Sequence, residues 1–381
     1  MKSRAKPNIL LLLGWNDPVV FSTIGRFAKA AGWHLELRPF FSETVPAGWK
    51  GDGMIVSHGE RKDVMRFIRK QAKLQPTVIF GANNPGISAP LVTHDDYAAG
   101  KLAAEHLLQQ GHRHFVWYAP FAGEVSSQRY TGFSDTLKLA GQTCLALNIP
   151  TQEWRQRKRL LAGHLRRLPR PLALFALDDQ AATEVIELCI EEGWKVPHEI
   201  AVMGCGNIEL ACECSHVPIT SIDQQESEAA WQTASLLDRL LKGCRAPKKP
   251  IVIPPKGVIR RQSTDALVIS DPRLQLVVTY LQGHLANMFS LIQISEHAGI
   301  SLRLLHELFL KELHTTPAKF LLRLRLECAC RLLRESDVLI SSIATRCGLA
   351  PMRNMNRCFQ RELHCTPRSY RNTFTQKVTE A

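Results

Sequence analysis

The sequence predicts an α/β protein in two parts: an N-terminal region of parallel sheets covered by helices, then an all-α region of two helix-turn-helix units. Short apolar runs alternate with helical patterns over the first two thirds of the 381 residues, as they do in parallel sheets flanked by helices. Beyond about residue 265 these runs stop, and apolar residues recur only at helical spacing. With 45% apolar and 22% charged residues, the composition is that of a globular protein and excludes a disordered or fibrous one.

The elements of the first part follow one another as strand and helix. Strands are predicted where apolar residues run together between turn residues, and helices where they recur every three or four positions. The predicted strands are 9–13, 34–37, 54–56, 77–80, 115–118, 172–176 and 201–203. The predicted helices include 20–31, 61–73 and 180–192. Ligands of such sheets bind beyond the carboxyl ends of the strands, so segments 15–17, 178–179 and 206–207 are candidate ligand contacts.

A change in composition marks the boundary between the two parts. Four prolines crowd residues 247–255, and strand-like runs disappear before Asp271. We therefore expect one domain at residues 1–265 and a second at residues 266–381. Asp271 and Pro272 are expected to begin the first helix of the second domain, as its N-cap and its first helical residue.

The C-terminal domain contains an internal repeat. Residues 309–317 recur at 359–367, with Phe, Glu, Leu, His, Thr and Pro at matching positions, and Gly299 has a counterpart in Gly348. Each copy holds a helix, a turn with a glycine and a second helix. This order is typical of a helix-turn-helix, whose second helix enters the major groove of DNA. The two units are expected at about 273–317 and 335–372.

Charge and residue type indicate what these units bind. Lys and Arg outnumber Asp and Glu by 48 to 35, and residues 271–381 hold 15 against 9, which makes this part about twice as basic per residue. Such an excess suits a polyanion. A helix expected at 318–334, roughly 25 Å long, can hold both second helices near the ~34 Å separation of successive major grooves. A plain helical bundle, the alternative, explains neither the repeat nor the charge. The expected DNA contacts are Ser301, Arg303, His306, Glu307, Arg353, Asn354, Asn356 and Arg357.

Several other classes of protein are excluded by what the sequence lacks. The eleven cysteines form no Cys-x-x-Cys pair, and the Cys-x-Cys pairs at 212–214 and 328–330 have no histidine partner at zinc spacing. We therefore predict reduced thiols and no metal site. No Gly-x-Ser-x-Gly, phosphate-loop or His-Glu-x-x-His motif occurs, so no catalytic residue, cofactor or enzymatic activity is predicted. The apolar run at 9–13 is too short for a signal peptide or a membrane span, so we expect a cytoplasmic protein without a membrane partner.

Motifs of the C-terminal domain follow a known pattern. They are Ser301-x-x-x-Leu305-x-x-x-Phe309, Thr316-Pro317, Arg325-Leu326-x-x-Ala329-x-x-Leu332-Leu333, Ile343-Ala344-x-x-x-Gly348, and Phe359 through Thr366-Pro367-x-x-Tyr370-Arg371. With them, residues 271–372 resemble the DNA-binding domain of the AraC/XylS family. Ser295, Leu349 and Met355 depart from the residues usual at their positions, but all three are small or apolar, as packing requires. The resemblance implies a sequence-specific transcription activator that binds half-sites in double-stranded DNA and contacts RNA polymerase.

Motifs of the N-terminal domain follow a second known pattern. They are Asp95-Asp96-x-x-x-Gly100, His106-Leu107, Gly111-His112-Arg113, Ser126-x-x-Arg129-x-x-Gly132-Phe133, Asp178-Asp179-x-x-Ala182, Val196-Pro197, Thr220-Ser221-Ile222-Asp223 and Arg260-Arg261-x-Ser263-Thr264. In this order they resemble the ligand-binding domain of the LacI/GalR family, itself similar to periplasmic sugar-binding proteins. The resemblance implies a homodimer whose two-lobed sensor holds a small carbohydrate, such as the pentose xylose, between its lobes. The expected ligand contacts are Trp15, Asp17, Arg129, Asp178, Asp179 and Asn207.

Alternatives stay open for some of these residues. Trp15 either stacks on the ligand or packs within its lobe, and Asp179 either contacts the ligand or caps the helix expected from Gln180. Gly206 stands where the family commonly has an Asp that reaches the sugar, so the identity of the effector is open. An alternative function is a cytoplasmic sugar-binding protein with a degenerate or ligand-independent sensor that acts as a repressor. A solute-binding protein that feeds a transporter is disfavoured by the repeat and by the absence of a signal peptide.

Overall fold

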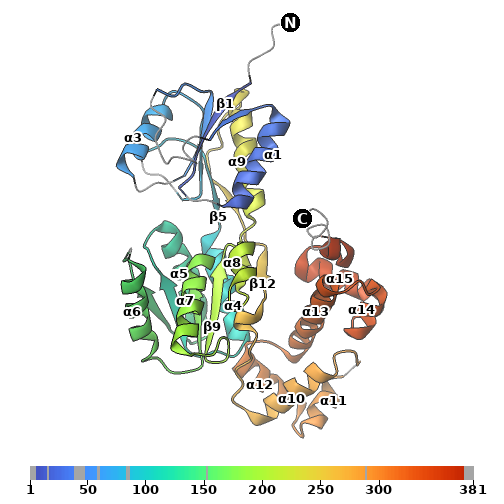
Figure 1. Ribbon diagram of the computed structural model, residues 1–381. Helices are drawn as coiled ribbons and strands as arrows, with labels where there is room; N and C mark the ends of the chain where they lie inside the picture. The colour runs from blue at the N-terminus through green and yellow to red at the C-terminus, as the bar shows by residue number, and fades with distance from the viewer. Residues whose placement is uncertain are drawn as a thin grey trace. The chain divides into compact units, whose positions relative to one another are not determined.

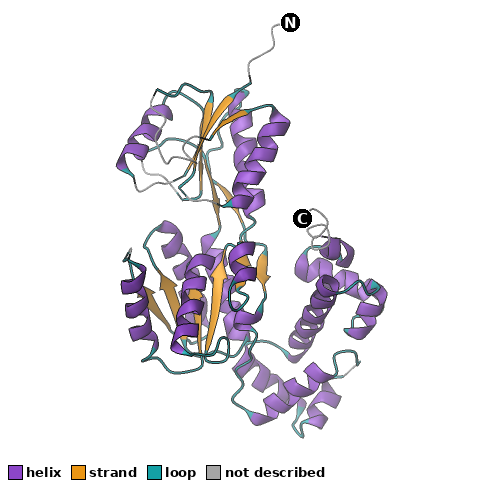
Figure 2. Cartoon of the chain, in the orientation of Figure 1, coloured by secondary structure: helices purple, strands orange, loops and turns teal. Residues whose placement is uncertain are grey.

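The computed structural model describes residues 6–14, 17–37, 48–57, 61–82, 86–151, 153–287 and 290–372 (Figure 1). The chain divides into two compact units. The N-terminal unit comprises Met1–His106 and Arg113–Ala266, and the C-terminal unit comprises Leu107–His112 and Leu267–Ala381. Strands and helices alternate in the first unit, whereas helices and loops build the second (Figure 2). Among the described residues, no helix combines the length and the apolar character that crossing a membrane requires.

Within the described residues, the N-terminal unit has two lobes, each built on a six-stranded sheet. The sheet of the first lobe has the order β11-β5-β4-β3-β1-β2, and its strands are parallel. The strands are β1 (Asn8–Leu12), β2 (His34–Glu36), β3 (Gly53–Val56), β4 (Thr77–Phe80), β5 (Leu91–His94) and β11 (Ile251–Ile253). The helices that cover this sheet are α1 (Pro18–Ala31), α3 (Lys62–Gln71) and α9 (Glu226–Leu241).

The apolar run of β1 is continuous because both faces of its sheet are covered. Ile9 and Leu11 lie in one apolar core with residues of α1 and α9, whereas Leu10 lies in another core with residues of α3. Side chains along a strand point alternately to opposite faces, so a strand that is buried on both sides shows no polar alternation. Helix α1 begins after Asp17, its N-cap, and ends at Gly32, whose φ of 71° favours glycine.

The sheet of the second lobe has the order β12-β10-β9-β8-β6-β7. Its pairings are parallel except at the edge, where β12 runs antiparallel to β10, a departure from the purely parallel sheets expected from the sequence. The strands are β6 (Phe115–Ala119), β7 (Cys144–Asn148), β8 (Leu172–Ala176), β9 (Ile200–Cys205), β10 (Thr220–Asp223) and β12 (Gly257–Ile259). The other elements are α4 (Asp96–Gln109), α5 (Glu124–Leu139), α6 (Trp154–Leu165), α7 (Asp179–Glu192), α8 (Glu209–Cys214) and the 3₁₀ turn η1 (Gln262–Thr264).

The C-terminal unit has two apolar cores that share one helix, α13. Phe320 and Leu321, in the first half of α13, pack in one core, and Leu326 and Leu333, in the second half, pack in the other. The described helices are α10 (Pro272–Gly283), α11 (Leu291–His297), α12 (Leu302–Leu313), α13 (Pro317–Glu335), α14 (Ile340–Arg346) and α15 (Met352–Leu363). The fold class predicted from the sequence, parallel α/β lobes followed by two helix-turn-helix units, is confirmed.

Candidate functional site

Three crossing segments carry the chain between the two lobes, and hydrogen bonds join them. The N–H of Asp95 donates to the carbonyl of Ile253 at 2.9 Å, and the N–H of Lys256 donates to the carbonyl of Asp223 at 2.8 Å. Because these bonds are between backbone groups, they do not depend on the side chains present. The crossing segments are residues 94–96, 223–226 and 254–256.

Arg129, on α5, bonds two of the crossing segments to the second lobe. Its Nε donates to Oδ1 of Asp96 at 2.8 Å, its Nη2 donates to Oε1 of Gln224 at 2.8 Å, and its Nη1 donates to the carbonyl of Leu177. Gln224 closes the network by donating from Nε2 to Oδ1 of Asp96 at 3.1 Å. Arg129 is only 7% exposed. Sequence reasoning missed Gln224, although it directly follows the strand β10 and stands at a carboxyl end where ligands are expected.

Asp178 and Asp179 follow β8 but have different partners. Asp178 is the N-cap of α7, and its Oδ1 accepts a hydrogen bond from the N–H of Ala181 at 2.8 Å. Of the two alternatives left open for Asp179, the helix cap is therefore wrong, because the helix begins one residue earlier than the pattern indicates. Asp179 is fully buried and accepts bonds from the Oγ of Ser221 at 2.5 Å and from the N–H of Ile208 at 2.7 Å. Burial raises the pKa of both carboxyl groups above the ordinary value.

Gly206 and Asn207 follow β9, and both have positive φ angles, 122° and 54°. A side chain at Gly206 would be strained at this φ, and its Cβ would lie 3.3 Å from Oδ2 of Asp179. Asn207 is bound on both sides: its N–H donates to Oγ of Ser221 at 3.0 Å, and its Oδ1 accepts from Arg261 at 2.9 Å. The backbone here thus suits glycine and leaves this strand end without a carboxylate of its own.

A partly buried acidic group, Glu226, lies at the end of one crossing segment. Burial, together with the neighbouring Asp17, raises the pKa of Glu226 to about 8, although Arg129 opposes the shift. The Nε2 of His94 lies 3.5 Å from its carboxylate, and burial lowers the pKa of His94 to about 4, so both groups are neutral near pH 7. Asp17 itself caps α1. Trp15 lies outside the described residues.

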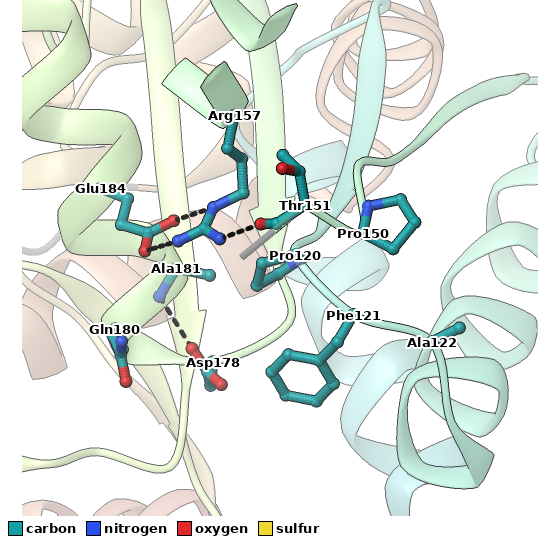
Figure 3. Close-up of a pocket in the computed structure, with 10 residues that line it drawn as sticks. All are labelled: Pro120, Phe121, Ala122, Pro150, Thr151, Arg157, Asp178, Gln180, Ala181 and Glu184. Carbon is teal, nitrogen blue, oxygen red and sulfur yellow. Dashed lines mark hydrogen bonds and ion pairs between the residues drawn. The ribbon is translucent and has the colours of Figure 1, made fainter. Parts of the chain in front are cut away.

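A pocket of about 440 Å³ opens at the carboxyl ends of β6, β7 and β8 (Figure 3). One wall is an ion pair in which Arg157 binds Glu184 at 2.6 Å and also donates to the carbonyl of Thr151 at 2.6 Å. The ring of Phe121, whose side chain is half exposed, lies at another wall. Of the ligand contacts predicted from the sequence, Asp178 lines this pocket. The lining residues are Pro120, Phe121, Ala122, Pro150, Thr151, Arg157, Asp178, Gln180, Ala181 and Glu184.

The two helix-turn-helix units repeat one another in local geometry as well as in sequence. The first consists of α11, a turn at Gly299 and α12, and the second of α14, a turn at Gly348 and α15; the φ angles of these glycines are 63° and 64°. In the first unit an aromatic pair packs edge to face with ring centroids 5.3 Å apart, and the pair at the equivalent positions of the second is 5.9 Å apart. These pairs are Phe309 with Phe320 and Phe359 with Tyr370.

The exposed faces of the two second helices differ. On α12, Arg303 donates to Oε1 of Glu307 at 2.9 Å, so its charge is paired on the helix itself. On α15, Arg353, Asn356 and Arg357 are exposed, and the acidic residue of this helix stands near its other end. The other predicted contacts have structural partners or are partly covered. Ser301 is the N-cap of α12, His306 is half-buried, and Asn354 donates to the carbonyl of Ala350 at 3.2 Å.

Both units match known domain families. Residues 104–264 match the periplasmic binding protein-like domain, and residues 294–373 match a helix-turn-helix domain. Over 371 residues the chain is 26% identical to the xylose operon regulatory protein of Escherichia coli (strain K12), covering 93% of this chain and 94% of that protein. It is also 30% identical, over 39% of its length and 56% of the relative, to the transcriptional activator RhaS of Salmonella arizonae.

Solved structures agree on the fold. A xylose-binding transcription activator matches 98% of this chain and 99% of its own with a TM-score of 0.60 at 24% identity. A LacI family regulator from Enterococcus faecalis V583, with bound ribose, matches 68% of this chain and all of its own with a TM-score of 0.57 at 21% identity. The chain is therefore a DNA-binding transcription regulator in which a periplasmic binding protein-like domain precedes a helix-turn-helix domain.

Proposed function

We propose that this regulator is a cytoplasmic activator that responds to a small carbohydrate, a pentose such as xylose. The observation that carries the proposal is the likeness, over 93% of the chain, to a regulatory protein of a xylose operon. In this proposal the protein is a homodimer. Its two copies bind two half-sites of double-stranded DNA and contact RNA polymerase.

The proposed effector site lies at the carboxyl ends of the sheets, where α/β proteins bind ligands. The pocket beside Asp178 has about 440 Å³, within the range of roughly 300–1,000 Å³ common for small-molecule sites. A carboxylate offers two acceptor oxygens and a guanidinium offers a fork of donors, and both suit neighbouring hydroxyl groups of a sugar. We assign the ligand contacts to Trp15, Asp17, Arg129, Asp178, Asp179 and Asn207.

The crossing segments supply the mechanism of the response. Arg129 holds two of them through Asp96 and Gln224, so a ligand that bonds any of these groups changes how the lobes are held. The ligand then shifts the population toward the lobe arrangement that it binds more tightly. Coupled to a dimer, this shift alters how the paired DNA-binding domains sit on their half-sites.

The DNA contacts follow from the second helices of the two units. Arg suits guanine O6 and N7, and Asn suits adenine N6 and N7, so α15 is the richer reading helix. Arg353, Asn354, Asn356 and Arg357 are assigned to the second half-site contact. Ser301, Arg303, His306 and Glu307 are assigned to the first.

Thermal unfolding with D-xylose, L-arabinose and D-ribose tests the effector. The true ligand raises the melting temperature, and at 100 times its Kd it adds about 2.7 kcal/mol. Asp178→Asn should weaken this shift while Lys138→Ala, an exposed change on α5, should leave it intact. If no sugar raises the melting temperature while footprinting still shows operator binding, the ligand-independent repressor becomes the better description. Transcription in vitro from the bound promoter then separates activator from repressor.

A further inference from the structure

Helix α6 and the turn after it form a basic segment at the edge of the second lobe, beside α7 (Figure 1). Residues 154–170 hold six arginines and one lysine, and no Asp or Glu. The inner side of the helix packs in the apolar core that it shares with α7, through Leu161, Ala162 and Leu165. Its opposite side is therefore left to solvent. Of the seven cations, Arg157 lines the pocket beside Asp178, and the others have no role in effector binding assigned above.

The fold itself uses four of these seven cations. Three of them form ion pairs with glutamates of α7, and the fourth lies over an aromatic ring. The ion pairs are Arg157 with Glu184 at 2.6 Å, Lys158 with Glu191, and Arg166 with Glu192 at 2.6 Å; the guanidinium of Arg170 lies 4.6 Å from the ring centroid of Trp194. The positive charge on the side of α6 that faces α7 is thus largely neutralised within the lobe.

The remaining three cations, Arg155, Arg159 and Arg167, are exposed, and their side chains have no ion pair or hydrogen bond with any described residue. Arg155 and Arg159 stand one helical turn apart, and like charges at this spacing repel each other. Arg167 lies in the turn that follows the helix. At 1.5 Å per residue, the helix separates Arg155 from that turn by about 15 Å. A row of positive charge therefore runs along α6 with nothing in the lobe to balance it.

We propose that this arginine row, Arg155, Arg159 and Arg167, binds phosphates of double-stranded DNA and adds a second contact to those of the helix-turn-helix units. Each strand of a duplex carries one phosphate per about 3.4 Å of axis, so a row of about 15 Å can reach about four phosphates. A guanidinium fork matches the oxygens of a phosphate better than an ammonium does, and all three unpaired cations are arginines. Contacts to phosphates position a protein on DNA without reading its sequence.

Charge selects DNA over the other partners that such a surface could take. The chain is a DNA-binding regulator, so a dense polyanion is present whenever it occupies its operator. A second copy of the chain is a poor match, because each copy has a net charge of +13. A lipid surface would need a broad apolar face, whereas polar side chains dominate the exposed side of α6. The proposal depends on the DNA-binding class of the protein and not on its response to a sugar.

The salt dependence of DNA binding by the full-length protein tests the arginine row. Fluorescence anisotropy measures the affinity for a random-sequence duplex at several KCl concentrations. Each phosphate contact contributes about 0.9 to the slope of log K against log salt, so the joint change Arg155→Gln, Arg159→Gln and Arg167→Gln should lower the slope by about 2–3. The affinity at about 50 mM salt should fall at least tenfold. An equal fall is expected on the operator, because phosphates carry no sequence information.

Two matched variants separate a phosphate contact from a general loss of charge or of structure. The joint change Lys29→Gln, Arg239→Gln and Lys248→Gln removes the same charge from exposed positions of the first lobe and should leave the slope unchanged. Lysine at all three positions of the arginine row keeps the charge and should retain most of the slope. Thermal unfolding should be alike in all these variants, because every substituted side chain is exposed.

Three results would overturn the proposal. The first is an unchanged slope in the glutamine variant of the arginine row, and the second is an equal loss of slope in the variant of the first lobe. The third is a fall in transcription in vitro from the bound promoter with DNA affinity unchanged, which would assign the row to an acidic protein surface instead of DNA.

Discussion

Two arginines show how differently this chain uses one residue type. Arg129, beside the crossing segments, is 7% exposed, and its donors are bound to Asp96, Gln224 and the carbonyl of Leu177. Arg353, on α15, is exposed to solvent. The first guanidinium is part of the fold, and a ligand must compete with the protein for it. The second is available to a partner without any rearrangement, so the two regions should respond oppositely to mutation.

The largest effect is expected when the buried arginine is removed. Arg129→Ala leaves the carboxylate of Asp96 without its cation in a buried position, which costs about 3–5 kcal/mol of unfolding free energy. Urea denaturation at pH 7 measures this loss, with Arg159→Ala, an exposed change on α6, as the control with an effect within about 0.5 kcal/mol. If Arg129→Ala is as stable as the wild type but no longer responds to the sugar, the main role of Arg129 is to bind the ligand and not to stabilise the fold.

At the exposed helix, mutation should change binding and spare stability. Arg353→Ala and Asn356→Ala should each weaken operator binding by about 1–3 kcal/mol, roughly 5- to 150-fold, with unchanged melting temperature. Arg303→Ala should cost less, because Glu307 already pairs with that guanidinium. Equilibrium binding to the operator and to random DNA measures the sequence-specific and the non-specific affinity of each variant. If affinity falls equally for the operator and for random DNA, these residues contact phosphates and not base edges. In that case α15 would not differ from α12 in how it recognises bases.

The partly buried acid Glu226, in one of the crossing segments, should make stability depend on pH. The pKa of Glu226 is raised from 4.5 to about 8 in the folded protein, so the folded state binds this proton more tightly than the unfolded state does. The stabilisation that this gives is present in full below pH 4.5 and is lost as the pH rises through about 8. His94, with its pKa lowered to about 4, acts in the opposite direction as pH falls below 6.5. Glu226→Gln should therefore be more stable than the wild type at pH 8.5, by on the order of a few kcal/mol. Urea denaturation at pH 6 and pH 8.5 measures the unfolding free energy of both proteins. If the difference between the two proteins is the same at both pH values, Glu226 does not have the raised pKa.

The smallest effect concerns a residue predicted from sequence as a DNA contact. Ser301 caps α12, its Oγ accepting from the N–H of Leu304 at 3.2 Å, so Ser301→Ala should cost about 1 kcal/mol of stability. The second unit has Pro351 at the equivalent place, with no side-chain cap bond to lose. Thermal unfolding followed by circular dichroism measures the difference. If Ser301→Ala instead loses operator affinity and keeps its stability, Ser301 contacts DNA.

Local sequence patterns predicted the helices and strands well. They did not predict which residues distant in the sequence would form hydrogen bonds with one another. The repeat placed α12 and α15 correctly because apolar spacing, a turn glycine and a terminal Thr-Pro recur within 50 residues. The partners of Arg129 lie 33, 48 and 95 residues away along the chain, so its burial in a network has no local signature. Asp178 and Asp179 are neighbours of identical type, and their roles are separated only by where α7 begins and by Ser221 across the sheet.

Helix α13 has a consequence for how this protein can change. Its 19 residues, about 28 Å at 1.5 Å each, belong to two cores at once, so the helix sets both the distance and the rotational phase of one reading helix against the other. One inserted residue would turn the second unit by about 100° relative to the first, so that α15 no longer faces the DNA groove next to the one we propose for α12. Substitution can therefore retune which bases are read, whereas a single insertion or deletion in α13 would dephase the two half-site contacts. The length of α13 is therefore the property on which the proposed pairing of the two half-site contacts depends.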